Sequence, residues 1–113
     1  MKPKISVIMS VYNSEKTLKR AVDSILNQIF DDFEFIIIDD CSIDNSWNIL
    51  KEYEKQDKRV KVFKNEKNLG LAANLNKGLK LAKADIIARM DSDDYSYPNR
   101  LKKSIILCKK IQI

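Results

Sequence analysis

The sequence lacks several residue types on which common catalytic sites depend. Its 113 residues include no histidine, which excludes Ser-His-Asp and Cys-His catalytic arrangements and histidine-based zinc sites. Gly70 and Gly78 are the only glycines, so a glycine-rich phosphate-binding loop of either nucleotide-binding type is excluded. Any phosphate that this chain binds must therefore be held in another way.

Cysteines and long apolar runs are also scarce. Cys41 and Cys108 are too few for a disulfide framework or a thiolate metal site, and we expect both to be reduced thiols in a reducing compartment. The segment 1–10 lacks the long apolar stretch and small-residue cleavage site of a signal peptide. No apolar run is long enough to cross a membrane, so neither a signal peptide nor a membrane span is expected.

Charge is plentiful and unevenly distributed. The net charge is +5, with five basic and eight acidic groups in residues 1–50 and sixteen basic and eight acidic groups in residues 51–113. The basic second half is compatible with a nucleic-acid partner. However, lysine outnumbers arginine 17 to 4, and the lysines are spaced as on solvated faces. We therefore expect a lysine-rich soluble surface and no nucleic-acid partner; weak attraction to an acidic membrane surface is the alternative.

Strand-like and helix-like segments alternate four times along the chain. We expect strands at 5–11, 33–39, 60–63 and 85–90, and helices at about 15–29, 47–55 and 71–82 and from Pro98 onward, the last with Leu101, Ile105 and Cys108 on one face. Asn13 or Ser14 is expected to cap the first helix. The alternation predicts a single α/β domain over residues 1–113, with a doubly wound, mainly parallel sheet and flanking helices.

Aspartates cluster directly after the predicted strands. Asp39, Asp40 and Asp44 follow the second strand, and Asp91, Asp93 and Asp94 follow the fourth. Ligands of such sheets bind at the carboxyl ends of the strands, so we expect these six carboxylates to converge on one rim. These carboxylates repel one another, and a hard cation such as Mg²⁺ or Mn²⁺ would offset that repulsion. The same cation could hold a phosphate in the absence of a glycine-rich loop.

Each of these residues also has a purely structural interpretation. Residues 39–44 could form a strand end followed by a helix cap, in which Ser42 and Asp44 serve well. A second adjacent carboxylate, Asp40, contributes nothing to such a cap. Residues 91–94 could form a solvated turn, Tyr12 could belong to the core or provide a stacking surface, and Trp47 is expected in the core.

Four ordered motifs resemble the family 2 glycosyltransferases. They are residues 6–13 (SVIMSVYN), 35–44 (FIIIDDCSID), 68–78 (NLGLAANLNKG) and 91–94 (DSDD), and the resemblance runs from Pro3 to about Leu107. It implies the N-terminal nucleotide-sugar-binding part of a GT-A fold, with a Rossmann-like sheet. The implied reaction transfers a sugar from a nucleoside diphosphate, with UDP expected, to an acceptor hydroxyl with inversion at the anomeric carbon.

The resemblance also implies roles for six residues. Ser10 and Tyr12 match residues that line the nucleobase pocket, and Asp40 matches an acceptor for the base, usually uracil. Asp91 and Asp93 match the D-x-D motif, which meets the ribose and a divalent metal, Mn²⁺ or Mg²⁺, on the diphosphate. Asp94 adjoins this motif, so Asp91 is assigned to the nucleotide and Asp93 and Asp94 to the metal, although the motif leaves open which of the three binds it directly.

Two departures from the family pattern affect these expectations. Leu75 stands where many relatives carry an arginine, so one phosphate contact is in doubt. The family also continues beyond the position of Ile113, and that later segment supplies the acceptor site and a carboxylate general base. We therefore expect a truncated chain, no catalytic base among its residues, and an isolated chain without transfer activity.

The resemblance further implies partners and a location. The whole enzyme would act on a carbohydrate or lipid-linked acceptor in polysaccharide biosynthesis, either free in the cytoplasm or at the inner face of the membrane. An alternative is a non-catalytic module that pairs with itself or another chain through an exposed sheet edge. A phosphoacceptor signalling domain fits poorly, because the acidic pair expected after its first strand is replaced here by residues 10–13 (SVYN).

Overall fold

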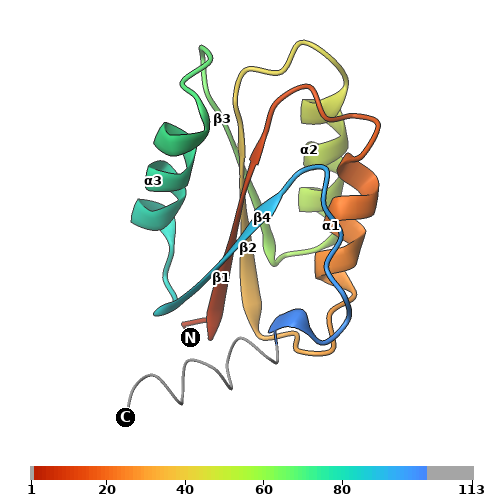
Figure 1. Ribbon diagram of the computed structural model, residues 1–113, viewed down its shortest axis with the longest axis vertical. Helices are drawn as coiled ribbons and strands as arrows, with labels where there is room; N and C mark the ends of the chain where they lie inside the picture. The colour runs from red at the N-terminus through yellow and green to blue at the C-terminus, as the bar shows by residue number, and fades with distance from the viewer. Residues whose placement is uncertain (1, 102–113) are drawn as a thin grey trace.

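The computed structural model describes residues 2–101, which form one parallel sheet with helices on both faces (Figure 1). In chain order the elements are β1 (Ile5–Val11), α1 (Leu18–Leu26), β2 (Phe33–Asp39), α2 (Ser46–Gln56), β3 (Val60–Lys64), α3 (Leu71–Leu81) and β4 (Ile86–Asp91). The strand order is β3-β2-β1-β4, with α1 and α2 on one face and α3 on the other. The predicted doubly wound α/β fold is confirmed.

The two central strands form the core of the molecule. Every residue of β2 is buried, and its isoleucines pair in register with β1, Ile8 opposite Ile36 and Met9 opposite Ile37. Side chains on both faces of β2 are covered by helices, which is why its sequence is a continuous β-branched run and does not alternate. The predicted bounds of β1 and β2 match the structure.

The strands at the two edges are covered less completely. In β3 and β4 buried residues alternate with more exposed ones, as the pattern of an edge strand requires. Helix α3 covers its face of the sheet closely because Gly78 has no side chain: a Cβ at this position would overlap Cγ2 of Ile8. This close approach lets the later part of α3 pack directly on the middle of β1.

The first helix is shorter than the predicted span 15–29. The N–H groups of Thr17 and Leu18 both donate to the carbonyl of Ser14, so a turn precedes the helix and neither Asn13 nor Ser14 is its N-cap. At the other end, the Gln28 side chain donates to the carbonyl of Tyr97, and Ile29 is 64% exposed instead of joining the core. Contacts with residues far along the chain therefore end the helix early.

The remaining expectations on single residues have mixed outcomes. Trp47 is half-buried and packs against the core, with the ammonium groups of Lys51 and Lys64 above its ring. Cys41 is a free thiol. Leu101 is fully buried, but most of the helix predicted from Pro98 onward, Cys108 included, lies outside the described residues. Within residues 2–101, no helix has the length and apolar character needed to cross a membrane.

Candidate functional site

An open cavity of about 780 Å³ lies at the carboxyl ends of the strands, a size typical of small-molecule sites. Its lining consists of Ser10, Tyr12, Asn13, Ser14, Glu15, Lys16, Thr17, Asp40, Asp44, Asn68, Gly70, Leu71, Asp91, Ser92 and Asp93. These residues lie at the carboxyl ends of β1 and β4, in the connections that follow the four strands, and at the start of α3. The cavity lies where the winding of the sheet reverses, between β1 and β4, which is the expected binding position in this class of fold.

The connection after β1 is locked to the connection after β2. The Asn13 N–H donates to Oγ of Ser42 over 2.9 Å, and Oδ1 of Asn13 accepts from the Ile43 N–H over 2.9 Å. Asn13 has a φ of 47°, a left-handed conformation that asparagine tolerates better than most residues. This turn leaves Tyr12 half exposed at the cavity, so its placement in the core is excluded.

The adjacent carboxylates Asp39 and Asp40 have different tasks. Asp39 closes its own turn by accepting from the Ser42 N–H over 3.2 Å and the Ser42 hydroxyl over 2.6 Å. Asp40 reaches across to the loop before α3, where it accepts from the N–H groups of Leu69 and Gly70 over 2.8 and 2.9 Å. Asp40 is therefore the anchor of this loop as well as part of the cavity wall.

These hydrogen bonds keep Asp40 ionised. Burial alone would raise the pKa of its carboxyl group, but hydrogen bonds from the Leu69 N–H, the Asn65 side chain and the Gly70 N–H outweigh burial and hold the pKa below its ordinary value. An ionised carboxylate can only accept hydrogen bonds. Asp40 thus presents a fixed acceptor at the cavity.

Two buried asparagines connect Asp40 to Ser10. The Asn65 side chain donates to Asp40 over 2.9 Å and to Oδ1 of Asn74 over 2.7 Å, and the Asn74 side chain donates to Oγ of Ser10 over 2.9 Å. Asn74 is a site residue that the sequence analysis did not identify. No signal in the sequence marked it, because the buried residues of α3 are Asn74 and Gly78, whereas Leu71 and Leu79 of the same helix are about half exposed.

The aspartates after β4 are also held by neighbouring loops. Oγ of Ser92 lies 2.7 Å from Oγ of Ser14, and the Ser92 carbonyl accepts from the Thr17 hydroxyl over 2.9 Å. These bonds fix the segment so that Asp91 and Asp93 both line the cavity. Thr17 and Ser92 are further site residues that the sequence analysis did not identify.

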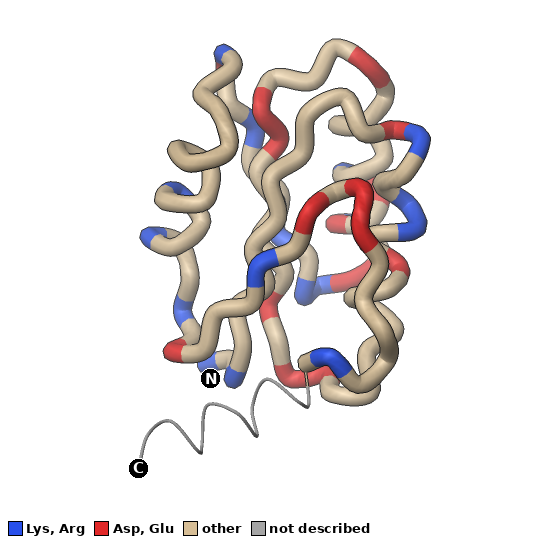
Figure 2. The backbone as a smooth tube through the Cα atoms, in the orientation of Figure 1, with Lys and Arg blue, Asp and Glu red and all other residues tan. Residues whose placement is uncertain are grey.

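Two of the six aspartates expected on the rim are not part of the cavity lining. Asp39 is turned toward Ser42, and the Asp94 carboxylate accepts from the Tyr95 N–H over 2.8 Å. The convergence expected from the sequence therefore holds for four carboxylates: Asp40, Asp44, Asp91 and Asp93. In Figure 2 these acidic positions lie on the connections that follow β2 and β4.

The cavity is acidic although the chain as a whole is basic. Its lining, all within the described part of the chain, carries five carboxylates, Asp40, Asp44, Asp91, Asp93 and Glu15, against the single ammonium of Lys16. A diphosphate would be repelled by this excess of negative charge unless a cation accompanied it.

The carboxylates fit only a cation whose coordination is completed by its ligand. No three acidic, histidine or cysteine side chains within residues 2–101 lie close enough together to hold a metal ion by themselves. Mg²⁺ commonly uses one or two carboxylates together with substrate phosphates and water. Asp93 lies on the cavity wall and supplies one such carboxylate, and Asp94 follows it in the chain.

Comparison with known proteins gives the same assignment as the motifs. The sequence profile of glycosyl transferase family 2 matches residues 6–107. The chain is 44% identical over 109 residues to the putative glycosyltransferase EpsE of Bacillus subtilis, covering 96% of this chain and 39% of EpsE. It is 45% identical over 104 residues to an uncharacterised glycosyltransferase of Methanocaldococcus jannaschii, covering 90% of this chain and 36% of that protein.

Solved structures show the same architecture. Residues 1–349 of Staphylococcus aureus TarS, crystallised with UDP-GlcNAc, superpose with a TM-score of 0.87 at 34% identity, over 95% of this chain and 31% of that one. The mannosyltransferase PcManGT of Pyrobaculum calidifontis, in complex with GDP-Man and Mn²⁺, shares the fold with a TM-score of 0.80 at 21% identity, over 92% of this chain and 31% of its own.

The chain spans well under half the length of the relatives that it matches. The match nevertheless includes all four strands and the loops that border the cavity. The chain therefore belongs to glycosyl transferase family 2, and it has the Rossmann-like sheet of a GT-A glycosyltransferase.

Proposed function

We propose that this chain is the donor-binding part of an inverting glycosyltransferase and binds a UDP-sugar together with a divalent cation in the cavity at the carboxyl ends of the strands. The observation that carries the proposal is the acidic lining of that cavity in a family 2 chain, with Asp91 and Asp93 side by side on its wall. A diphosphate fits such a lining when Mg²⁺ or Mn²⁺ offsets the charge.

Each side of the cavity receives a different part of the donor. Ser10, Tyr12 and Asp40 contact the base, with the exposed Tyr12 ring providing a stacking surface and Asp40 accepting a hydrogen bond. Asp91 binds the ribose. TarS, which was crystallised with UDP and with UDP-GlcNAc, supports a UDP donor for this chain at 34% identity.

Asp93 and Asp94 are the proposed metal ligands, and they start from different positions. Asp93 lines the cavity, whereas Asp94 lies outside its lining and accepts from the Tyr95 N–H through one carboxylate oxygen. When bound, the cation acts as a Lewis acid that stabilises the negative charge of the departing diphosphate. The residues of this chain orient the donor: the base against Asp40 and the diphosphate end toward Asp93.

The remainder of the proposal concerns the whole protein. A longer chain supplies the general base and the site for a carbohydrate or lipid-linked acceptor of polysaccharide biosynthesis, in the cytoplasm at the inner face of the membrane. The length of the relatives supports this division, since the chain covers 39% of EpsE and 31% of the TarS fragment. The isolated chain then binds donor but transfers no sugar.

Calorimetry with UDP tests this proposal. We expect heat of binding in the presence of Mn²⁺, a large loss of affinity when the metal is chelated, and at least a tenfold weakening in Asp93→Asn, which removes a charged ligand. Asp85→Asn is the matched control, because Asp85 is an exposed aspartate that pairs with Lys2 and lies outside the cavity lining. Absence of heat at millimolar UDP and Mn²⁺ would contradict the proposed function.

A further inference from the structure

A chain of hydrogen bonds under the cavity begins at a lysine and ends at Ser10. Lys77 donates through Nζ to Oδ1 of Asn65 over 2.9 Å, and Asn65 donates to Asp40 and Asn74. Asn74 then donates to Ser10. Both asparagines are almost completely buried, with 4% and 1% of their surfaces exposed, so their orientations are set by these partners and not by water.

The direction of every bond in this chain is fixed by its charged ends. A lysine ammonium can only donate, so the atom of Asn65 that faces Lys77 must be the carbonyl oxygen. An ionised carboxylate can only accept, so the atom that faces Asp40 must be the Asn65 amide nitrogen. The second N–H of the same nitrogen reaches Asn74, whose oxygen therefore accepts it. The Asn74 nitrogen is left to donate to Ser10.

This direction determines what Ser10 offers to a ligand. Its oxygen accepts from Asn74, and within the described residues its hydroxyl hydrogen has no acceptor. Ser10 lines the cavity, so the hydrogen is available to a bound molecule. Asp40, also on the lining, accepts from Asn65 and Leu69 through Oδ1 and from Gly70 through Oδ2, so Oδ2 has fewer of these partners than Oδ1.

We propose that Asn74 is a positioning residue that sets base specificity by holding Ser10 as a hydrogen-bond donor opposite the acceptor Asp40. This inference rests on the proposed function and names the base edge that the pocket selects. A donor and an acceptor together complement a ring N–H beside a carbonyl, as in uracil and guanine. Cytosine and adenine present the reverse, an unprotonated ring nitrogen beside an amino group.

A single substitution at residue 74 should change Ser10 from a hydrogen-bond donor into an acceptor toward the cavity. Asn74→Asp keeps the shape of the side chain but has no N–H to donate, so Ser10 must turn its hydrogen toward residue 74. Ser10 then offers an acceptor to the cavity. A base that brings a carbonyl to this point loses its partner, whereas a base that brings an amino group gains one.

The test compares UDP with CDP, each in the presence of Mn²⁺. We expect the wild-type chain to prefer UDP by about tenfold or more, and Asn74→Asp to reduce the UDP-to-CDP affinity ratio by about tenfold, mainly by weakening UDP. Asn48→Asp, the same change on the exposed face of α2, is the control and should leave the ratio unchanged. A purely structural role of Asn74 would weaken both nucleotides equally and leave the ratio as it was.

A second pair of variants tests whether Asn74 acts on base specificity through the Ser10 hydroxyl. Ser10→Ala should lower the ratio, and adding Asn74→Asp to Ser10→Ala should change it no further, because the group through which Asn74 acts is already absent. Asn74→Ala, without added charge, should also lower the ratio and serves if Asn74→Asp does not fold, as judged by circular dichroism. An unchanged ratio in a folded Asn74 variant overturns the role of Asn74, whereas failure of the wild-type chain to bind either nucleotide overturns the proposed function as well.

Discussion

At the scale of single residues, Asp40 has two tasks that depend on the same charge. Its carboxylate fastens the loop before α3 through the N–H groups of Leu69 and Gly70, and the residue also lines the cavity. Asp39, next to it, closes a local turn through Ser42 instead. Two identical neighbouring residues therefore differ in function, and Cys41, which follows them with a left-handed φ of 64°, lies in the turn that Asp39 closes.

We predict that Asp40→Asn lowers the free energy of unfolding by about 1–3 kcal/mol. The carboxylate of Asp40 accepts from N–H donors, so the amide nitrogen of asparagine would place a donor opposite a donor and lose that hydrogen bond. The loss should depend on pH. The folded pKa of Asp40 lies below its unfolded value, so its contribution is complete above the unfolded pKa and disappears as pH falls through the folded one. Urea unfolding at pH 7 and at successively lower pH measures this, and a difference that stays constant on acidification would contradict it.

Single residues also show what the sequence could and could not predict about the site. Ser10, Tyr12, Asp40, Asp91 and Asp93 were predicted and all line the cavity, because each lies at or just after the end of a strand and the carboxyl ends of parallel strands meet at one edge. Asn74 was missed because its importance comes from its contacts with Asn65 and Ser10, which belong to other parts of the fold. Asp94 was predicted as a metal ligand from its motif alone, and its role stays a prediction.

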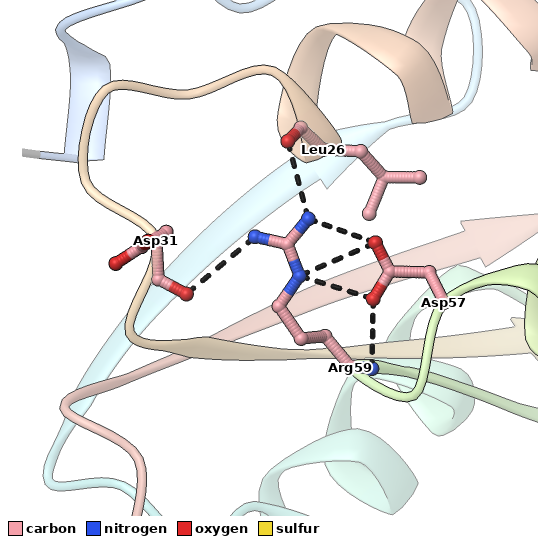
Figure 3. Close-up of polar contacts among 4 residues, drawn as sticks. All are labelled: Leu26, Asp31, Asp57 and Arg59. Atoms are coloured by element: carbon pink, nitrogen blue, oxygen red, sulfur yellow. Dashed lines mark hydrogen bonds and ion pairs between the residues drawn. The ribbon is translucent and has the colours of Figure 1, made fainter.

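At the scale of elements, the end of the sheet opposite the cavity is held by one arginine. Arg59 forms a fork with the Asp57 carboxylate, donates to the Leu26 carbonyl at the end of α1 over 3.2 Å and to the Asp31 carbonyl over 3.5 Å (Figure 3). Its guanidinium also lies 4.5 Å from the centre of the Phe33 ring. This one side chain joins α1, β2 and β3 at their lower ends.

We predict that Arg59→Lys destabilises the fold by about 1–3 kcal/mol, because an ammonium cannot reproduce the planar fork and the two carbonyl contacts together. UDP affinity of the folded variant should match the wild type, since Arg59 lies at the end of the sheet away from the cavity. Thermal unfolding and calorimetry on the same sample measure both quantities. A loss of UDP affinity without a loss of stability would show that this end of the sheet is coupled to the site.

The elements themselves were predicted most accurately where burial is complete. The strands 5–11 and 33–39 have the same bounds in the structure, because a strand covered on both faces has a continuous apolar sequence that turns interrupt clearly. The helix predicted over 15–29 is only nine residues long, Leu18–Leu26. Its ends are set by Thr17 bonding to Ser92 and by Gln28 bonding to Tyr97, contacts that apolar periodicity does not report.

At the scale of the whole molecule, the outer edge of β4 is a surface on which this chain can pair. Within residues 2–101, β4 has a strand neighbour only on the β1 side, and Ile87 is 40% exposed. We predict concentration-dependent dimers by light scattering and their loss in Ile87→Lys, since a lysine discourages edge-to-edge pairing. Ile29→Lys, at another exposed isoleucine, is the control, and a mass of 13.1 kDa at every concentration would contradict the prediction.

The central claim about the whole molecule is that an acidic cavity in a basic chain binds a nucleoside diphosphate through a divalent cation. The absence of glycine-rich loops and histidine is consistent with this account, because carboxylates and a cation can hold a diphosphate where backbone loops cannot. The family assignment and the cavity lining point to the same edge of the sheet.

Nuclear magnetic resonance of the labelled chain tests this claim most directly. On titration with UDP and Mg²⁺, the amide signals of Gly70 and Ser92 should shift, and replacing a small fraction of Mg²⁺ by paramagnetic Mn²⁺ should broaden residues 91–93 most strongly. The amide of Arg59, at the opposite end of the sheet, should be unchanged. Broadening centred away from residues 91–93, or no shifts at millimolar UDP, would contradict the account.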